Sequence, residues 1–284
     1  MPHSTHKKTN SSSPSHHILR EWYIHRLKYE WTRGQFFQRF ELDRATPLVM
    51  DGLWADGWRH FGSHFFRDMY NLEGHRLSRV IPLRVCVQER SLPRDHRRNL
   101  KNNKDLSVEF KPIKFEHEHY EIFEKHAKKF TKNRPDDIYQ FISPQAQLIP
   151  CPSRMCEVRT AEGKLLALSL IDIGAQSISS IYAMFHPDAY TRGLGIYTLL
   201  MELDYARTLQ KTYLYTGYAH IQSSYYDYKK RFRGTEFYDW QGTWRPLSEL
   251  DNIPFPQHKF EKEDIPQELL TIQDDEDESV DDED

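Results

Sequence analysis

The sequence predicts an α+β fold in which a mixed sheet is flanked by helices, with a smaller N-terminal α/β half packed against it. Three β-like runs follow one another at residues 153–159, 165–173 and 177–185. A glycine-bearing loop at residues 191–195 then leads into a run of helical spacing that ends near Leu209. With 284 residues, the chain is long enough to bury a sizeable core.

Before these elements, residues 1–17 are rich in Ser, Thr, Pro and His and lack apolar periodicity. We therefore predict a disordered tail, whose histidines reflect its composition rather than a metal site. Residues 18–40 mix aromatic with basic side chains, a pattern that fits either a strand or irregular packing.

The N-terminal half of the predicted fold covers residues 18–132. Residues 47–57 predict a helix that closes at an Asp-Gly pair, and the alternation in residues 58–67 predicts strand structure. Residues 80–87 read as a nearly continuous apolar strand. The next segment, residues 92–104, is strongly basic, so it is either a solvated helix face or a segment that contacts phosphates.

An amphipathic helix at residues 115–131 and a polar, proline-marked connection at residues 132–144 lead to the second half, residues 133–250. Residues 161–164 are the expected hairpin turn between the first two strands of this half, and residues 212–218 predict its last strand. Three meandering strands, a glycine loop with a helix and a last strand are the order of a GNAT-type (acyl-CoA N-acyltransferase) sheet.

Residues 251–284 are an acidic segment that we predict to be a second disordered tail. From Glu261 onward it holds thirteen Asp and Glu and one Lys, a net charge of −12, so the remaining residues must carry +9 to give the formal net charge of −3. A basic body with an acidic tail indicates a polyanionic partner, although an acidic tail also serves solubility alone.

The three cysteines, Cys86, Cys151 and Cys156, include no CxxC pair and are too few for a metal site of their own. No apolar run approaches the roughly 20 residues of a membrane span. The N-terminus lacks the apolar core of a signal peptide. We therefore expect a cytoplasmic protein with no membrane partner.

Several motifs resemble, in order and spacing, those of one enzyme family. The matching segments are GWRHFG at 57–62 with FFR at 65–67, IPLRV at 81–85, YAMFHPD with GLGIY at 182–197, YLYTGY at 213–218 and YKKRFR at 228–233. Over roughly residues 47–247, the chain therefore resembles the arginyl-tRNA–protein transferases and the bacterial aspartate/glutamate leucyltransferases.

This resemblance implies that the chain transfers arginine or leucine from Arg-tRNA or Leu-tRNA to the N-terminal α-amine of acceptor proteins, with acidic N-termini as the expected acceptors. The tRNA ester supplies the energy, so no cofactor is implied. Some family members hold an iron–sulfur cluster on cysteines that are missing from residues 68–79 of this chain. We therefore expect no metal and no metal cluster.

The glycine loop offers Arg192, Gly193 and Gly195 as contacts for a phosphate or for the terminal ribose of the tRNA, because it leads into a helix N-terminus. Tyr197 stands where the CoA-binding pattern of acetyltransferases has a small residue. Its side chain would crowd a pyrophosphate there, although the position also fits a core aromatic.

A basic-aromatic patch is expected to complete the site for the aminoacyl end. Its members are Tyr218, Tyr228, Lys229, Arg231 and Arg233. Aromatic rings stack on unpaired bases, and Lys and Arg meet the backbone phosphates. Any single tyrosine of this patch also fits core packing.

Asp172 and Tyr218, near the ends of two predicted strands, are the candidate catalytic residues. Asp172 is a candidate to orient or deprotonate the acceptor amine, with a simple turn carboxylate as the alternative. Arg59, Arg84 and Arg154 are candidates to bind an acidic acceptor.

Two rival functions stay open at this point. One is a CoA-dependent GNAT acyltransferase, which Tyr197 disfavours. The other is a non-catalytic RNA- or peptide-binding relative, which residues 223–227 favour because they depart from the family pattern.

Overall fold

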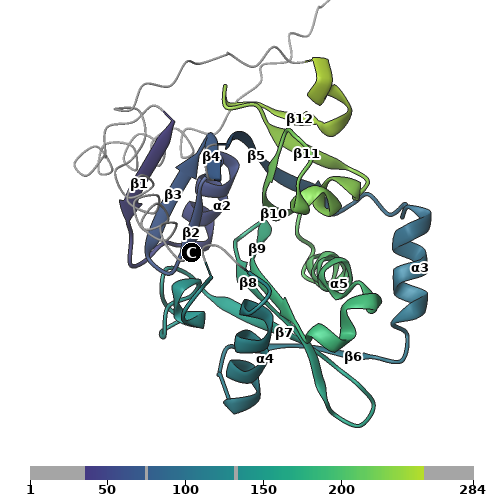
Figure 1. Cartoon of the computed structure of the whole chain (residues 1–284). Helices are drawn as coiled ribbons and strands as arrows, with labels where there is room; N and C mark the ends of the chain where they lie inside the picture. The colour runs from purple at the N-terminus through teal and green to yellow at the C-terminus, as the bar shows by residue number, and fades with distance from the viewer. Residues whose placement is uncertain (1–35, 74–75, 131–133, 253–284) are drawn as a thin grey trace, which may run out of the picture.

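The computed structural model describes residues 36–73, 76–130 and 134–252 (Figure 1). The helices are α2 (Pro47–Ala55), α3 (Arg94–Asn102), α4 (His117–Ala127) and α5 (Leu194–Thr208), with short 3-10 helices η1 (Ile138–Gln140), η2 (Pro187–Arg192), η3 (Tyr225–Arg231) and η4 (Leu247–Asn252). The predicted tail at residues 1–17 lies outside the described residues, as does the acidic tail after Asn252.

The strands form two sheets. They are β1 (Phe37–Glu41), β2 (Arg59–Phe61), β3 (His64–Asp68), β4 (Tyr70–Glu73), β5 (Arg76–Cys86), β6 (Ser107–Pro112), β7 (Ser153–Arg159), β8 (Leu165–Ile173), β9 (Ser177–Phe185), β10 (Tyr213–His220), β11 (Thr235–Tyr238) and β12 (Trp244–Pro246). A small sheet has the order β1-β3-β2, and a nine-stranded mixed sheet has the order β12-β11-β5-β10-β9-β8-β7-β6, with β4 paired to β5. The predicted α+β fold with a mixed sheet flanked by helices is confirmed.

The centre of the large sheet is buried on both faces by helices. Leu168 and Leu170 of β8 pack with Phe123 of α4, whereas Ala167 of the same strand packs with Tyr197 of α5. Side chains alternate across a strand, so α4 and α5 cover opposite faces of the sheet. Every residue of β8 except the last is buried. This agrees with its reading as an apolar strand.

The small sheet packs with α2 around an aromatic core. The Phe40 ring stacks on Phe65 at 4.8 Å between centroids and meets Trp58 edge-on at 4.6 Å. Trp54 of α2 joins the same cluster. The segment whose structure stayed open, residues 18–40, therefore ends in a strand, while its part before residue 36 lies outside the described residues.

The sequence predicted most elements of the large sheet. The helix at Pro47–Ala55, the strands β7, β8 and β9, helix α5 and strand β10 all fall where their patterns indicated. Strands β4, β6, β11 and β12 were not predicted. The large sheet takes β5 and β6 from before residue 133 and the other strands of its main path from after it. The proposed boundary between residues 132 and 133 stays a prediction.

Strands β9 and β10 of the large sheet pair over only part of their length. They run parallel but pair only where Ser177–Ser179 face Tyr213–Tyr215. Beyond these positions both strands continue, β9 to Phe185 and β10 to His220, without pairing to each other. The two strands therefore separate in the middle of the sheet, and α5 connects them.

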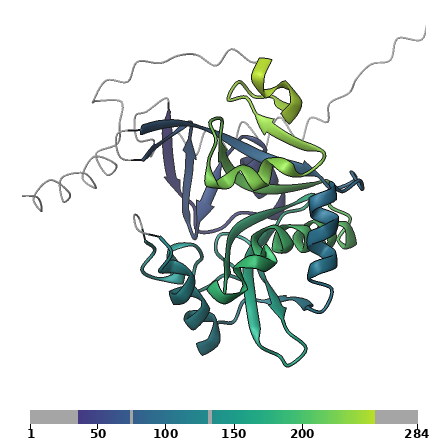
Figure 2. The same cartoon turned by 45° about the vertical axis from the view of Figure 1, so that its right-hand side comes forward.

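Helix α3 and the small sheet lie far from each other in the molecule (Figure 1 and Figure 2). Figure 1 and Figure 2 both show α3 at one edge, beside α5, with the small sheet on the opposite side. Among the helices of the described residues, none combines the length and the apolarity needed to span a membrane.

Candidate active site

A cavity of about 880 Å³ opens where β9 and β10 separate. Residues 180–183 of β9 and 216–218 of β10 line it, and each of these runs begins directly after the last paired position. The glycine loop, η3, α4 and β3 supply other parts of its wall. We call this space the wedge cavity.

Arg59 lies at the closed end of the wedge cavity. It follows the left-handed turn at Gly57 and is nearly fully buried. Its Nη1 donates to the Ser179 hydroxyl at 2.7 Å, and its Nη2 donates to the Ser180 carbonyl. The guanidinium therefore sits at the point where β9 leaves β10.

Gly217 brings a second cation to the same point. It has φ +92 and follows a register shift in the pairing of β10 with β5, so the strand bulges here. A Cβ at this position would lie 3.3 Å from Lys229 Nζ and 3.4 Å from Arg59 Nη2. Glycine leaves the space that both side chains occupy, and both line the cavity.

The Lys229 amine is held in an unusual environment. Its Nζ donates to the Tyr218 carbonyl at 3.4 Å and lies 5.0 Å from the centroid of the Tyr226 ring. Burial, and then repulsion from Arg59, lower the pKa of Lys229 to about 7, while the Glu202 carboxylate opposes this shift. Glu202 is itself fully buried on α5, which raises its pKa to about 7. A lysine that is partly neutral near pH 7 is suited to accept a proton.

The wall formed by α4 carries a further basic side chain. Lys129 Nζ lies 4.6 Å from the Phe185 ring centroid and 5.5 Å from that of Tyr225. Burial lowers the pKa of Lys129 to about 8. Burial also lowers the pKa of His126, one turn earlier, to about 4. In contrast, Asp68 is the one carboxylate among the described lining residues, and it forms an ion pair with Arg39.

Aromatic rings make up much of the remaining lining. Phe141 stacks on Tyr182 at 3.8 Å between centroids and meets Phe61 edge-on at 5.0 Å, which gives one end of the cavity an apolar surface. At the rim, Tyr190 and Tyr225 are 71% and 62% exposed. Large exposed rings beside a cavity are available to stack against a ligand.

The glycine loop is positioned by α3. Gly193 has φ +63, and its carbonyl accepts from Asn99 Nδ2 at 3.0 Å. Asn99 and Asn103 also donate to the Arg192 carbonyl, at 3.1 and 2.9 Å. Gly193 and Gly195 line the wedge cavity, as do Tyr228 and Lys229. The structure thus brings these four predicted residues together with Arg59.

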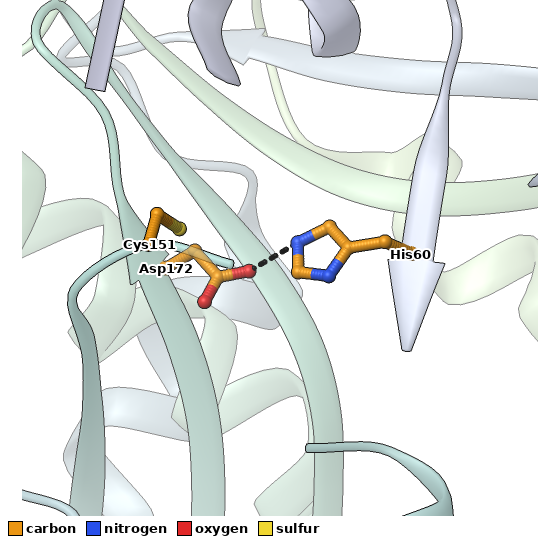
Figure 3. Close-up of side chains that lie close together, drawn as sticks. All are labelled: His60, Cys151 and Asp172. Carbon is orange, nitrogen blue, oxygen red and sulfur yellow. Dashed lines mark ion pairs between the residues drawn. The ribbon is translucent and has the colours of Figure 1, made fainter. Parts of the chain in front are cut away.

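Asp172 lies elsewhere. It is fully buried on β8 and does not line the cavity. One oxygen of its carboxylate accepts from the Ser153 hydroxyl, and the other lies 2.8 Å from His60 Nε2 (Figure 3). Its oxygens contact Ser153 and His60 and no solvent reaches them, so the structure does not bring Asp172 to the cavity; its role toward the acceptor amine stays a prediction.

His60, Cys151 and Asp172 form a compact buried group (Figure 3). His60 Nδ1 donates to the Gly62 carbonyl at 2.9 Å. Burial, and then the Asp172 carboxylate, raise the pKa of the Cys151 thiol. Two ligands of a tetrahedral zinc, each about 2.0–2.1 Å from the metal, lie about 3.3 Å apart. The 2.8 Å between His60 and Asp172 is therefore a direct ion pair, which joins β2 of the small sheet to β8.

Tyr218, the other candidate catalytic residue, does line the cavity. Its hydroxyl, however, donates to the Gly57 carbonyl at 2.9 Å, and burial raises its pKa. Tyr218 therefore ties β10 to the turn after α2, and its catalytic role stays a prediction.

Other predicted residues lie outside the wedge cavity. Both Arg192 amino groups contact the Asp105 carboxylate, at 3.0 and 2.9 Å, outside the cavity, and the phosphate contact of Arg192 stays a prediction. Tyr197 is a buried core residue whose hydroxyl donates to the Asn103 carbonyl, which agrees with the core-aromatic alternative given for this position. Arg231 and Arg233 are exposed, outside the cavity.

Two of the three arginines proposed for the acceptor are also elsewhere. Arg84 stacks on Tyr213, with its Cζ 3.7 Å from the ring centroid, and pairs with Glu236. Arg154 donates to the Gln147 side chain at 3.0 Å. Neither side chain lines the cavity, and the acceptor role of both residues stays a prediction.

The sequence did not reveal Tyr190, Lys129 or the stacked pair of Phe141 and Tyr182 as cavity residues. Tyr190 stands between the His-Pro-Asp turn at residues 186–188 and the glycine loop, and this position is a sequence signal that could have indicated a lining residue. Nothing in the local pattern of Lys129 or Phe141 separates them from an ordinary helix end and an ordinary loop.

Comparison with known proteins connects this geometry to one family. The family model described as "Arginine-tRNA-protein transferase, C terminus" matches residues 118–239. A protein named aspartate/glutamate leucyltransferase from Gluconacetobacter diazotrophicus is 31% identical over 62% of this chain and 68% of its own length. A protein of the same name from Chromohalobacter salexigens is 30% identical over 67% of this chain and 77% of its own length.

Proposed function

The chain belongs to the family of arginyl-tRNA–protein transferases and aspartate/glutamate leucyltransferases, and on this basis we propose that it transfers leucine from leucyl-tRNA to proteins that begin with Asp or Glu. As a member of this family it is an aminoacyltransferase that uses an aminoacyl-tRNA as donor. The choice of leucine and of an acidic acceptor is our inference from the wedge cavity.

The observation that supports this choice is the charge of the cavity wall. Arg59, Lys129 and Lys229 face the space, while the one lining carboxylate in the described chain, Asp68, is paired with Arg39. An acceptor carboxylate would meet unpaired N–H donors, and charge-assisted hydrogen bonds are the strong ones. We assign this contact to Arg59, which still has N–H groups beyond those that bind Ser179 and Ser180.

The same charge distribution favours leucine over arginine as the transferred group. An arginyl side chain would bring a guanidinium into a space that already holds basic groups and lacks a free carboxylate among its described lining residues. A leucyl side chain would instead pack on the apolar end made by Phe61, Phe141 and Tyr182. The names of the bacterial relatives agree with this choice.

The donor end fits the rim of the cavity. Gly193 and Gly195, at the start of α5, line the space, and a helix N-terminus there is suited to the terminal ribose or phosphate. Tyr190 and Tyr225 offer exposed rings on which the terminal base would stack. This arrangement would hold the ester carbon between the rim and the closed end of the wedge.

The reaction then needs one proton to move. The acceptor α-amine attacks the ester carbonyl, a C–N bond forms, and the 3′ oxygen of the ribose leaves as an alcohol after taking up a proton. Lys229, partly neutral near pH 7, is the cavity residue suited to take the proton from the amine and return it to the leaving oxygen. Positioning of the two substrates supplies much of the rate.

The test is a transfer assay with purified protein. Leucyl-tRNA and arginyl-tRNA would each be offered with peptides that begin with Asp, Glu, Asn or Lys, and acetyl-CoA would be offered separately. We expect leucine to appear on the Asp and Glu peptides, detected by mass spectrometry. Arginine transfer at equal rate would overturn the donor assignment, and acetylation without leucyl transfer would overturn the proposed function.

A further inference from the structure

A strongly basic surface lies next to the wedge cavity and takes no part in it. It consists of Arg90, Arg94, Arg97, Arg98, Lys101, Lys104, Arg231 and Arg233, all of them exposed. We propose that this surface, centred on α3, binds the phosphates of the tRNA acceptor stem while the single-stranded 3′ end enters the cavity. The proposal rests on the proposed function for the identity of its ligand.

The helix is built to present its charges outward. Arg94, Arg97, Arg98 and Lys101 follow the spacing of one helix face, and the opposite face carries buried His96 and Asn103. Within the described chain, no carboxylate lies within ion-pair distance of these four basic residues. Basic side chains that are left unpaired along one face form a suitable partner for a polyanion.

This helix also touches both segments that form the cavity rim. Asn99 and Asn103 hold the carbonyls of the glycine loop, as described above. On the other side, the His96 ring packs on Phe232 at 4.4 Å between centroids, and Arg231 lies 3.9 Å from Asp95. A duplex on this surface would therefore end beside Gly193 on one side and beside η3 on the other.

The pairing of Arg192 with Asp105 fits the same assignment. Three carboxylates beside the basic surface each interact with an arginine: Asp105 with Arg192, Asp95 with Arg231, and Glu89 with Arg233. These contacts partly offset Arg231 and Arg233, and no ion pair within the described residues offsets the four basic side chains of α3. The contact would be with the sugar-phosphate backbone, which carries no sequence information, so the surface would bind acceptor stems of different sequence.

The experiment measures binding of deacylated leucine tRNA at several salt concentrations. The variant R94Q/R98Q/K101Q removes three charges from the surface, and K114Q/K125Q/K164Q removes three exposed charges elsewhere as a matched control. We expect the first variant to bind roughly tenfold to a hundredfold more weakly and to reduce the salt slope by roughly 2 to 3, while the control stays within about twofold of the wild type.

A minimal donor, leucyl-adenosine without a stem, shows whether the cavity is intact. We expect the α3 variant to use this donor nearly as well as the wild type but intact leucyl-tRNA poorly. An unchanged salt slope, an equal loss in the control variant or an equal loss with the minimal donor would each overturn the proposal. Loss of transfer in the wild type, with the expected tRNA binding, would reject the proposed function and leave the binding surface standing.

Discussion

Lys229 offers the sharpest test of the chemistry. Its pKa, about 7 instead of the ordinary 10.5, corresponds to roughly 5 kcal/mol against the charged form at about 1.36 kcal/mol per pH unit. Substitution Lys229→Arg keeps a cation in this position but removes the group that can lose a proton near neutral pH. We expect the rate of leucyl transfer to fall by roughly 10²- to 10⁴-fold, the usual contribution of general base catalysis.

The pH profile separates this role from a merely structural one. In the wild type, kcat/KM should rise through a pKa near 7 as Lys229 loses its proton. The acceptor α-amine also titrates, at about 7.7–8.0, so the rates are corrected for its deprotonated fraction. After this correction, the limb near 7 should vanish in Lys229→Arg. A variant that keeps both its rate and this limb would refute the assignment.

The buried Lys229 should lower the stability of the fold although it raises the rate of transfer. Because the folded pKa of Lys229 lies below the unfolded one, the unfolded state binds the extra proton between about pH 10.5 and 7, and this destabilises the fold progressively as the pH falls. Lys229→Met removes the penalty. We expect this variant to unfold at a higher temperature than the wild type at pH 7, by an amount that shrinks toward pH 10, although it is inactive in transfer.

Three further predictions concern other parts of the molecule. Arg59→Gln should lower kcat/KM for Asp and Glu peptides by roughly 10- to 100-fold without a matching loss for Asn peptides. Arg84→Gln, outside the cavity, should leave this preference unchanged. An equal loss of kcat/KM for acidic and Asn peptides in Arg59→Gln would exclude Arg59 from acceptor recognition. Gly193→Ala should lower the free energy of unfolding by about 1–2 kcal/mol and reduce transfer, because φ is +63 and a Cβ would lie 2.7 Å from Asn99 Nδ2. An unaltered midpoint of urea unfolding would contradict this. His60→Phe should lower the free energy of unfolding by roughly 3–5 kcal/mol because it leaves the Asp172 carboxylate buried without its partner. A smaller decrease in the double variant with Asp172→Asn would support the pairing of the two side chains.

The elements that the sequence predicted well are those whose burial is local and periodic. Strand β8 is apolar almost throughout because both of its faces are covered, and α5 repeats its apolar residues at helical spacing. Strands β11 and β12, with four and three residues, lack enough length for a pattern to emerge. The pairing of β11 with β5 is a long-range contact that no local signal encodes, and β12 joins the sheet through β11.

The site was predicted less evenly, for a similar reason. The glycine loop, Tyr228 and Lys229 carry motif signals and do line the cavity. Asp172 lies away from the cavity, and the sequence gives its position along β8 but not its partner, His60, which lies 112 positions earlier and in another sheet. The pairing of Arg192 with Asp105, which follows α3, is likewise a contact that nothing local predicts.

The separation of β9 and β10 creates both a structural need and a binding site. Two strands that stop pairing leave backbone carbonyls in need of donors, and a buried polar group without a partner is costly. Arg59 donates to the Ser180 carbonyl and Lys229 to the Tyr218 carbonyl, one on each strand. The side chains that face the substrate therefore also satisfy carbonyls that the open wedge leaves unpaired, although for Lys229 this one contact returns less than the burial of its charged form costs. It follows that a loss of activity in Arg59→Gln indicates a recognition role only where the variant keeps its fold and its use of Asn peptides.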